Sequence, residues 1–400
     1  MNILFVCAEY PFEGQATGGF GRYVETIAEV LAEKKQNVTV LCKSSKETNI
    51  FFEQGVRIFP IQPVGHELVA RMKKLNFIPF VGRLSHFLDF PILWSFSVFL
   101  KLERLEEKEI IDVIEGGDFG AELFFYLLLR RSHTKTVIKL HTPSFIIQKY
   151  NDAKKDKLFY TLMNFLELFC LKRVHRAYSP TRELAREVSK RIGIQVQDII
   201  PYPIKEKNKG MEIKHVSNTV LYVGKLQVKK GVFVLLDAIR MVLQKNPKTT
   251  LLLIGPDTRV NGKSTKEDII KFITMHKIQK YVHIIKEISH KKLLTYYQNS
   301  SLIVVPSIWE NFPNVILEAM VHGPAIVASN VGGIKEMITD GREGILVAPG
   351  DSQKLAEKIT KILHSPDLRI SLIKQAYASA QRRFGKDKIG EMTLRFYQNL

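Results

Sequence analysis

The sequence is short of the side chains that build disulfides and metal centres. Only three cysteines occur in its 400 residues, Cys7, Cys42 and Cys170, and no two of them have CxxC spacing. Widely separated cysteines indicate reduced residues in or near a core, not bridges or zinc ligands. The chain also has no Asp-x-Asp motif, the paired carboxylates that commonly hold a divalent metal beside phosphate groups. We therefore expect no metal and no other cofactor.

Long apolar runs are missing as well. The best candidate, residues 87–100, has 14 residues and contains Asp89 and Pro91, so it is too short and too broken to span a bilayer. The N-terminal MNILFVCA has no basic leader, and we expect a first strand and a cytoplasmic location. The aromatic, apolar and basic segment from Phe77 to Lys101 allows a further hypothesis, peripheral contact with an anionic membrane at its inner face. The alternative is a packed helix of the first domain.

Acidic residues are too few to balance the basic ones. There are 59 Lys and Arg against 40 Asp and Glu, which gives a net charge of +19 and a pI near 9.6. This charge predicts anionic partners: nucleic acid, an anionic membrane or phosphorylated small molecules. A nucleic-acid-binding protein would show aromatics interleaved with a basic face, or a known module. Neither occurs, so nucleic acid is not an expected partner.

Short apolar, β-rich runs alternate with helical patterns in both halves of the chain. This alternation predicts parallel sheets covered on both faces, an α/β fold of two Rossmann-like, doubly wound domains facing across a cleft. The predicted strands are 3–8, 37–42, 55–59, 111–115, 136–140 and 174–179 in the first half, and 219–224, 250–255, 282–286, 302–306, 325–329 and 344–348 in the second. The predicted helices include 22–35, 231–245, 264–276, 290–299, 314–322 and 352–364.

A linker composition separates the halves. Residues 201–215 are rich in Pro, Lys and polar side chains, as domain boundaries often are. We place the first domain at 1–202 and the second at 203–383, followed by a last helix at 384–400.

Two loops that follow strands could bind an anion. GGFGRY (18–23) begins with Gly18 and Gly19 and leads into a helix, whose free amides attract anions. A tight turn that binds no ligand would favour the same glycine-rich sequence. VGKLQVKKG (223–231) places Lys225 and Lys230 after the first strand of the second domain, where two cations suit a diphosphate. A solvated basic loop is the alternative.

The stretch ENFPNVILEAM carries two carboxylates, Glu310 and Glu318. Pro313 suits a first helical turn and Asn314 an N-terminal capping position, so the helix amides would face a phosphate or sugar. Glu318 lies on a mostly apolar helix, where a carboxylate is costly unless its lone pairs are satisfied. The two hydroxyls of a ribose would satisfy them, and a backbone amide or a lysine would do so equally. His141, in KLHTP, follows a strand of the first domain and is a candidate for the same cleft.

These motifs, in this order, resemble the family 4 retaining glycosyltransferases of the GT-B fold, the glycosyl transferases of group 1. The resemblance covers nearly the whole chain and is strongest from Val220 to Pro349. It rests on the two glutamates and the lysine loop, together with LLLIGPD (251–257), VASNVGGIKE (327–336) and DGREGILVAPGD (340–351).

The resemblance implies a role for each candidate residue. Lys225 and Lys230 would bind the donor diphosphate, Glu318 the ribose and Glu310 the donor sugar, with His141 near the transferred sugar. Further donor contacts would come from Gly18, Gly19, Gly255, Asn311, Phe312, Asn314 and Val315. The last helix would cross back to pack on the first domain.

Two departures from the family pattern affect the site. Lys225 stands where Arg is usual, so a point charge replaces a bidentate grip on phosphate. Asn311 stands where Gly is frequent. Asn tolerates the left-handed conformation best after Gly, so we expect the loop to keep its geometry.

The hypothesis is therefore a retaining, metal-independent transferase that moves a sugar from a nucleotide-diphosphate sugar, UDP-sugars favoured, to a glycan, lipid-linked or small-molecule acceptor. The alternatives are a nucleotide-sugar epimerase or a sugar phosphorylase of the same fold and, further off, a basic nucleic-acid-binding protein.

Overall fold

The structure is a computed structural model that describes residues 1–11, 18–46, 48–74, 79–150, 157–204, 218–260, 263–286 and 288–400. The chain divides into two units, one made of Met1–Pro203 and Lys386–Leu400, the other of Ile204–Gly385. The predicted boundary at 202/203 falls one residue earlier. Most of the predicted linker, 201–215, lies outside the described residues, as does Phe77 of the segment considered for membrane contact.

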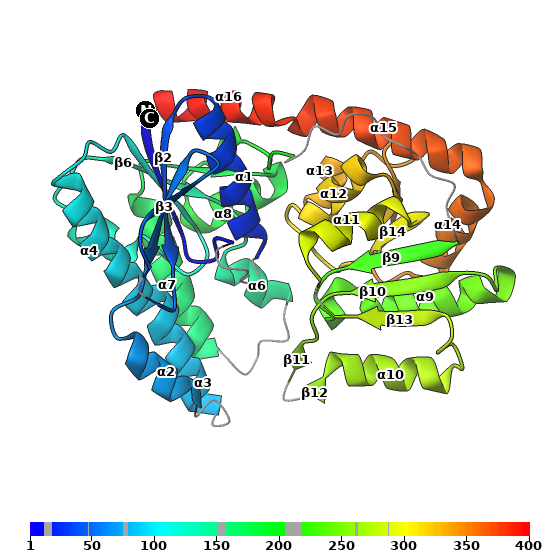
Figure 1. Cartoon of the computed structure of the whole chain (residues 1–400). Coiled ribbons are helices and arrows are strands. Elements are labelled where there is room, and N and C mark those ends of the chain that lie inside the picture. The colour runs from blue at the N-terminus through cyan, green and yellow to red at the C-terminus, as the bar shows by residue number, and fades with distance from the viewer. Residues whose placement is uncertain are drawn as a thin grey trace. The chain divides into compact units, whose positions relative to one another are not determined.

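The first unit is built on an eight-stranded sheet with the order β3-β4-β2-β1-β5-β6-β7-β8. Every pair is parallel except β3–β4. All six strands predicted for this half are present, and the short strands β3 and β8 were missed. The strands of the chain are drawn as arrows in Figure 1. In this unit their bounds are β1 Asn2–Cys7, β2 Asn37–Lys43, β3 Phe51–Glu53, β4 Val56–Ile61, β5 Val113–Gly117, β6 Lys135–Lys139, β7 Arg176–Ser179 and β8 Asp198–Ile199.

Helices join these strands, as parallel pairing requires. One connection departs from α-helical geometry: η1, between α3 and α4, is a π-helix that contains Pro91. Among the described residues no helix has the length and apolar character needed to cross a membrane. The bounds are α1 Gly19–Glu33, α2 His66–Lys74, α3 Pro79–Phe87, η1 Leu88–Trp94, α4 Ser95–Glu106, α5 Phe124–Leu129, α6 Ser144–Tyr150, α7 Lys157–Arg173, α8 Arg182–Ile192 and α16 Lys386–Gln398.

A buried carboxylate ties the C-terminal helix α16 to the sheet of the first unit. Glu115, on β5, is fully buried and accepts hydrogen bonds from the hydroxyls of Tyr178 (2.5 Å), Tyr397 (2.6 Å) and Tyr23 (3.1 Å). Tyr397 belongs to α16, so this bond reaches from the end of the chain to the middle of the sheet. Burial raises the pKa of Glu115, and the tyrosine hydroxyls oppose that shift. A buried carboxylate is tolerated here because its lone pairs are satisfied.

The second unit is built on a six-stranded, fully parallel sheet with the order β13-β10-β9-β14-β15-β16. The six predicted strands are all present. A two-stranded hairpin, β11–β12, and the long helix α15 were not predicted. The strands are β9 Thr219–Val223, β10 Thr250–Ile254, β11 Arg259–Val260, β12 Lys263–Ser264, β13 Val282–Ile285, β14 Leu302–Val305, β15 Ala325–Ser329 and β16 Ile345–Val347.

The core of the second unit lies between its sheet and its helices. Leu302 and Val304 of β14 join a buried apolar cluster with residues of α9, α10 and α14. The alternate residues Ile303 and Val305 are buried as well, as expected of a parallel strand covered on both faces. The helices are η3 Val228–Lys230, α9 Val232–Lys245, α10 Thr265–Met275, α11 His290–Gln298, α12 Asn314–His322, α13 Ile334–Met337, α14 Ser352–His364 and α15 Pro366–Phe384.

Candidate functional site

The loop that carries Lys225 is held at the end of β9 by contacts on its backbone. The hydroxyl of Tyr222 donates a hydrogen bond to the carbonyl of Lys225 (2.8 Å), while the Lys225 side chain is exposed. Gly255, at the end of β10, has φ +150, and a Cβ there would lie 2.1 Å from the carbonyl oxygen of Gly224. The two strand ends can therefore approach this closely only with glycine at 255. Gly255 therefore has a structural role in this loop, in addition to the donor contact predicted for it.

Lys230 and Glu310, predicted to bind diphosphate and sugar, lie against each other. The Nζ atom of Lys230 lies 2.5 Å from Oε1 of Glu310, and the hydroxyl of Ser307 donates to the same oxygen (2.8 Å). Both bonds use one carboxylate oxygen. Lys229 lies close to the same carboxylate: burial lowers its pKa, Lys230 adds to the shift, and Glu310 opposes it. The loop therefore brings two lysines, Lys229 and Lys230, to a single carboxylate, and Lys225 lies near enough to Lys229 to add to the lowering of its pKa.

The backbone of Glu310 is fixed by the NVGGIKE segment. The amide of Gly333 donates to the carbonyl of Glu310 (2.9 Å). Gly332 has φ +49, and a Cβ there would lie 1.9 Å from the same carbonyl oxygen, so only glycine fits this contact. Asn311 is not among the residues with positive φ, so the loop does not require the left-handed conformation at this position. Gly332 and not Asn311 supplies the left-handed backbone at this point.

Helix α12 begins one residue earlier than a cap at Asn314 would require. Pro313 occupies the capping position with ψ 119, and Asn314 is the first helical residue. The extended ψ of Pro313 keeps it outside the helix, and the residue before a proline is driven toward extended backbone as well. Asn314 and Val315 therefore belong to the first turn, where amides lack helical partners. Phe312 is buried and its ring packs edge-on against Phe384 (5.5 Å), so its side chain belongs to the core.

Glu318 is satisfied by side chains of α11. The hydroxyl of Tyr297 donates to its Oε2 (2.7 Å), and Nε2 of His290 lies 3.3 Å from its Oε1. The Glu318 side chain is 18% exposed. Among the residues that the structure describes, the recorded partners are thus a tyrosine and a histidine, where the sequence analysis considered a backbone amide or a lysine. Each carboxylate oxygen has two lone pairs, so Oε1 and Oε2 could each accept one more hydroxyl.

In the first unit, His141 lies beside the glycine-rich loop. Its Nδ1 lies 2.5 Å from the hydroxyl of Tyr202, and its backbone amide donates to Oδ1 of Asp118 (3.0 Å). The ring of Phe20, from GGFGRY, lies 5.9 Å from the His141 ring between centroids. Asp118, which follows β5 and is fully buried, was not predicted from the sequence. Burial raises its pKa to about 7, and backbone amides such as that of His141 oppose the shift.

Gly18 and Gly19 stand at the start of α1. Gly18 is the capping residue, and Gly19 is the first helical residue. The carboxylate of Glu9 lies against Gly18, because a Cβ there would come within 2.0 Å of Oε2 of Glu9. Phe20 links this turn to His141, so the predicted residues of the first unit form one group. Those of the second unit form another, around Lys230, Glu310 and α12.

The chemistry that each group can support follows from its charges. The lysine loop and the start of α12 offer cations and amides to an anion, and Glu318 offers acceptor oxygens to hydroxyls. Within the parts of the chain that the structure describes, no three His, Cys, Asp or Glu side chains are grouped as metal ligands would be.

Comparisons with protein families match both units. Residues 203–379 match the model described as glycosyl transferases group 1. Residues 17–204 match the model described as glycosyltransferase family 4. The glycogen synthase of Mycobacterium tuberculosis H37Rv is 30% identical over 164 residues, which cover 41% of this chain and 36% of the synthase. The chain thus spans less than half the length of this relative.

Two solved structures are similar over the whole chain. Sucrose-phosphate synthase from Thermosynechococcus elongatus has a TM-score of 0.75 and 18% identity, with 100% of this chain and 98% of that chain covered. Anabaena HepE in complex with UDP-glucose has a TM-score of 0.67 and 18% identity, with both chains covered to 100%. At this identity the likeness establishes the predicted GT-B fold.

Proposed function

The chain belongs to the group 1 glycosyltransferases, and from this premise we propose that it transfers a sugar from a nucleotide-diphosphate sugar to a hydroxyl acceptor. The single observation that carries the proposal is the Lys230–Glu310 pair, set between the lysine loop and the first turn of α12. A cation for phosphate and a carboxylate for sugar hydroxyls are thereby held in direct contact. We propose retention of the anomeric configuration and no metal.

In the proposed reaction the bond between the anomeric carbon and the diphosphate breaks, and negative charge builds on the leaving phosphate. Lys225, Lys230 and the first-turn amides of α12 would stabilise that charge, which is the largest electrostatic demand of the step. The acceptor oxygen would bond to the anomeric carbon on the face that the diphosphate leaves. The proton of the acceptor hydroxyl would pass to the leaving phosphate oxygen, so no separate protein base is required.

The sugar and the ribose would be held by different carboxylates. Oε2 of Glu310, which neither Lys230 nor Ser307 uses, can accept a hydroxyl of the donor sugar, and His141 is assigned to the same sugar. Glu318 would accept the ribose hydroxyls, with Tyr297 and His290 fixing its orientation. A glycosidase would instead set two carboxylates on either side of the scissile bond. Here each carboxylate has another partner and another task.

UDP-sugars are the favoured donors. HepE, which has the same fold, has been solved in complex with UDP-glucose. The acceptor is proposed to be a glycan, a lipid-linked sugar or a small molecule.

The test is turnover of UDP-glucose, UDP-galactose and UDP-N-acetylglucosamine in EDTA, followed by proton NMR of the anomeric signals. UDP release with an α-configured product supports the proposal. Loss of activity in EDTA, or a β-configured product, contradicts the metal-independent or the retaining part. An epimerised donor with no UDP released would identify an epimerase, and turnover that requires inorganic phosphate would identify a phosphorylase.

Contact with an anionic membrane is a second proposal, and the structure changes where we locate it. In the segment first considered, Pro91, Trp94 and Val98 are buried, as the packed-helix alternative expects. On α7, by contrast, Leu158 is 73% exposed and Phe165 65% exposed, with Leu162 between them. Lys157, Lys172 and Arg173 flank this stripe and are exposed too. Exposed apolar residues bordered by cations suit an interfacial helix.

A further inference from the structure

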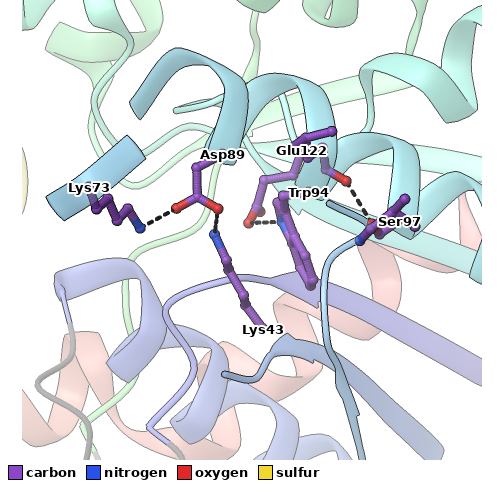
Figure 2. Close-up of polar contacts among 8 residues, drawn as sticks. Lys43, Lys73, Asp89, Trp94, Ser97 and Glu122 are labelled. Carbon is purple, nitrogen blue, oxygen red and sulfur yellow. Dashed lines mark hydrogen bonds and ion pairs between the residues drawn. The ribbon is translucent and has the colours of Figure 1, made fainter. Parts of the chain in front are cut away.

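Two lysines of the first unit share one carboxylate. Nζ of Lys43 lies 2.5 Å from Oδ1 of Asp89, and Nζ of Lys73 lies 2.7 Å from Oδ2 of the same residue. Figure 2 shows Asp89 between the two ammonium groups. Each lysine bonds a separate oxygen, so the two ammonium groups contact the Asp89 carboxylate from two directions. The carboxylate of Asp89 stands where an oxyanion of another molecule could be held.

This cluster lies where parallel sheets bind ligands. Lys43 is the last residue of β2, and the carboxyl ends of parallel strands form the usual binding edge. The side chains are partly open to solvent: Lys43 is 22% exposed, Asp89 15% and Lys73 51%. A ligand can therefore reach them, while the low exposure of Lys43 and Asp89 strengthens the interaction between the charges.

The segment that carries Asp89 has unusual geometry. Asp89 is the second residue of the π-helix η1, and π-helices occur frequently at functional sites. The other end of η1 is fixed, because Nε1 of Trp94 donates to Oε1 of Glu122 (3.0 Å), as Figure 2 shows. Glu122 also accepts from the amide of Ala8, just after β1 (2.8 Å). Both ends of the π-helix are thus attached to the carboxyl edge of the sheet, which sets the position of Asp89.

The charges leave the cluster positive. Burial lowers the pKa of Lys43, and the bond to Asp89 opposes that shift. Burial of Asp89 opposes its ionisation, but its bonds to both lysines outweigh this and lower its pKa. With two lysines and one aspartate, the cluster has a formal net charge of +1. A simple ion pair needs only one lysine, whereas here two cations converge on one carboxylate.

We propose that Lys43 and Lys73 form an acceptor subsite that binds a phosphate ester on the acceptor molecule. Asp89 keeps the two ammonium groups in position before the acceptor binds. This proposal rests on the proposed function, since it names the acceptor class of the same enzyme. Each lysine ammonium has three donors, so both can bond phosphate oxygens while keeping Asp89. Lysine binds phosphate as a point charge, and two lysines suit the two charges of a phosphate monoester.

The experiment measures binding of sn-glycerol 3-phosphate by calorimetry to wild type, Lys73→Gln, Asp89→Asn and Lys74→Gln, with glycerol as the neutral probe. Lys74 follows Lys73 on α2 and is exposed, so it is the matched control. Lys73→Gln is expected to weaken binding about tenfold or more, the effect of one hydrogen bond between charged groups. Asp89→Asn is expected to tighten binding, because it removes the competing carboxylate. A solely structural ion pair predicts no tightening.

A second arm separates the sources of phosphate. Vesicles of phosphatidylcholine with and without phosphatidic acid replace the soluble probe, and dependence on Lys73 in this arm alone identifies a lipid phosphate. UDP is titrated into the same variants. UDP affinity that is equal in wild type and Lys73→Gln separates this subsite from the donor site. Failure of wild type to bind UDP would count against the proposed function alone. Equal binding of both phosphate probes by wild type and Lys73→Gln would overturn the subsite.

Discussion

The Nζ atom of Lys230 lies 2.5 Å from Oε1 of Glu310, with side chains that are 30% and 14% exposed. The cation and the carboxylate that we assign to the donor are thus held directly against each other. An ammonium group has three donors, and Lys230 can bond a phosphate oxygen while it keeps Glu310. The carboxylate in turn keeps Oε2 for a sugar hydroxyl.

The first prediction concerns Glu310→Gln. The substitution keeps the shape of the side chain but removes the charge that holds Lys230 and the sugar. We expect the turnover number for donor hydrolysis to fall about 100-fold, in the range seen when one electrostatic contact to a transition state is removed. UDP affinity should stay the same or rise, because Lys230 loses a competing partner. A variant that loses UDP binding and turnover together would contradict this division of tasks.

The second prediction tests the ribose contact of Glu318. Wild type should bind UDP about tenfold more tightly than 2′-deoxy-UDP, since a hydrogen bond to a charged group contributes roughly 1.5–3 kcal/mol. In Glu318→Gln that preference should shrink, because the charged acceptor is gone. Calorimetric titrations with both nucleotides measure the ratio. An unchanged ratio in the variant would assign the ribose to another residue.

The third prediction is a pH dependence of stability caused by Glu122. This residue is fully buried, and burial raises its pKa from 4.5 to about 8. Because the folded-state pKa lies above the unfolded value, the contribution of Glu122 to the free energy of unfolding is fully present below about pH 4.5. This contribution is lost as the pH rises through 8. Wild type should therefore lose stability from pH 5 to pH 9.

Glu122→Gln is the matched variant for that measurement. Its amide oxygen can accept from Ala8 and Trp94, as Oε1 does in wild type, and it does not titrate. The difference in free energy of unfolding between variant and wild type, measured by urea titration, should grow in favour of the variant as pH rises, by an amount on the order of a few kcal/mol. Parallel pH curves for the two proteins would show that Glu122 does not titrate in this range.

Much of the fold could be predicted from the sequence because parallel strands buried on both faces are continuous apolar runs. LIVVP and AIVAS became β14 and β15 for this reason. The strands that were missed are too short to show a pattern, such as β3, FFE, and β8, DI. Their pairing depends on neighbouring strands that are distant in sequence, and periodicity carries no sign of that.

The sequence predicted which residues belong to the candidate site, but it did not predict which side chains they contact. Spacing placed Lys230 and Glu310 at strand ends of the same domain, yet nothing in the sequence indicated that they would form an ion pair. The partners of Glu318, Tyr297 and His290, come from α11, and no motif joins the two helices. Asp118 was missed because an aspartate after a strand is common, and its bonds to backbone amides appear only once β5 and β6 are paired.

The fourth prediction concerns the exposed stripe on α7. Flotation with vesicles that contain phosphatidylglycerol should recover wild type, and vesicles of phosphatidylcholine alone should recover less. Leu158→Ser combined with Phe165→Ser should abolish the difference, because these side chains are 73% and 65% exposed and would supply the inserted surface. Ile270→Ser, at an exposed position of the second unit (44%), is the control. Equal flotation of wild type with both kinds of vesicle would remove the membrane proposal.

The most direct test of the central claim is a titration of UDP against wild type, Lys230→Ala and Lys271→Ala in EDTA. Lys271 is 74% exposed on α10 and serves as the control for lost positive charge. We predict that wild type and Lys271→Ala bind UDP with equal affinity, and that Lys230→Ala binds it about tenfold to a hundredfold more weakly, the effect of one hydrogen bond between charged groups. Equal affinity in wild type and Lys230→Ala, or binding of UDP that requires a divalent metal, would contradict the account.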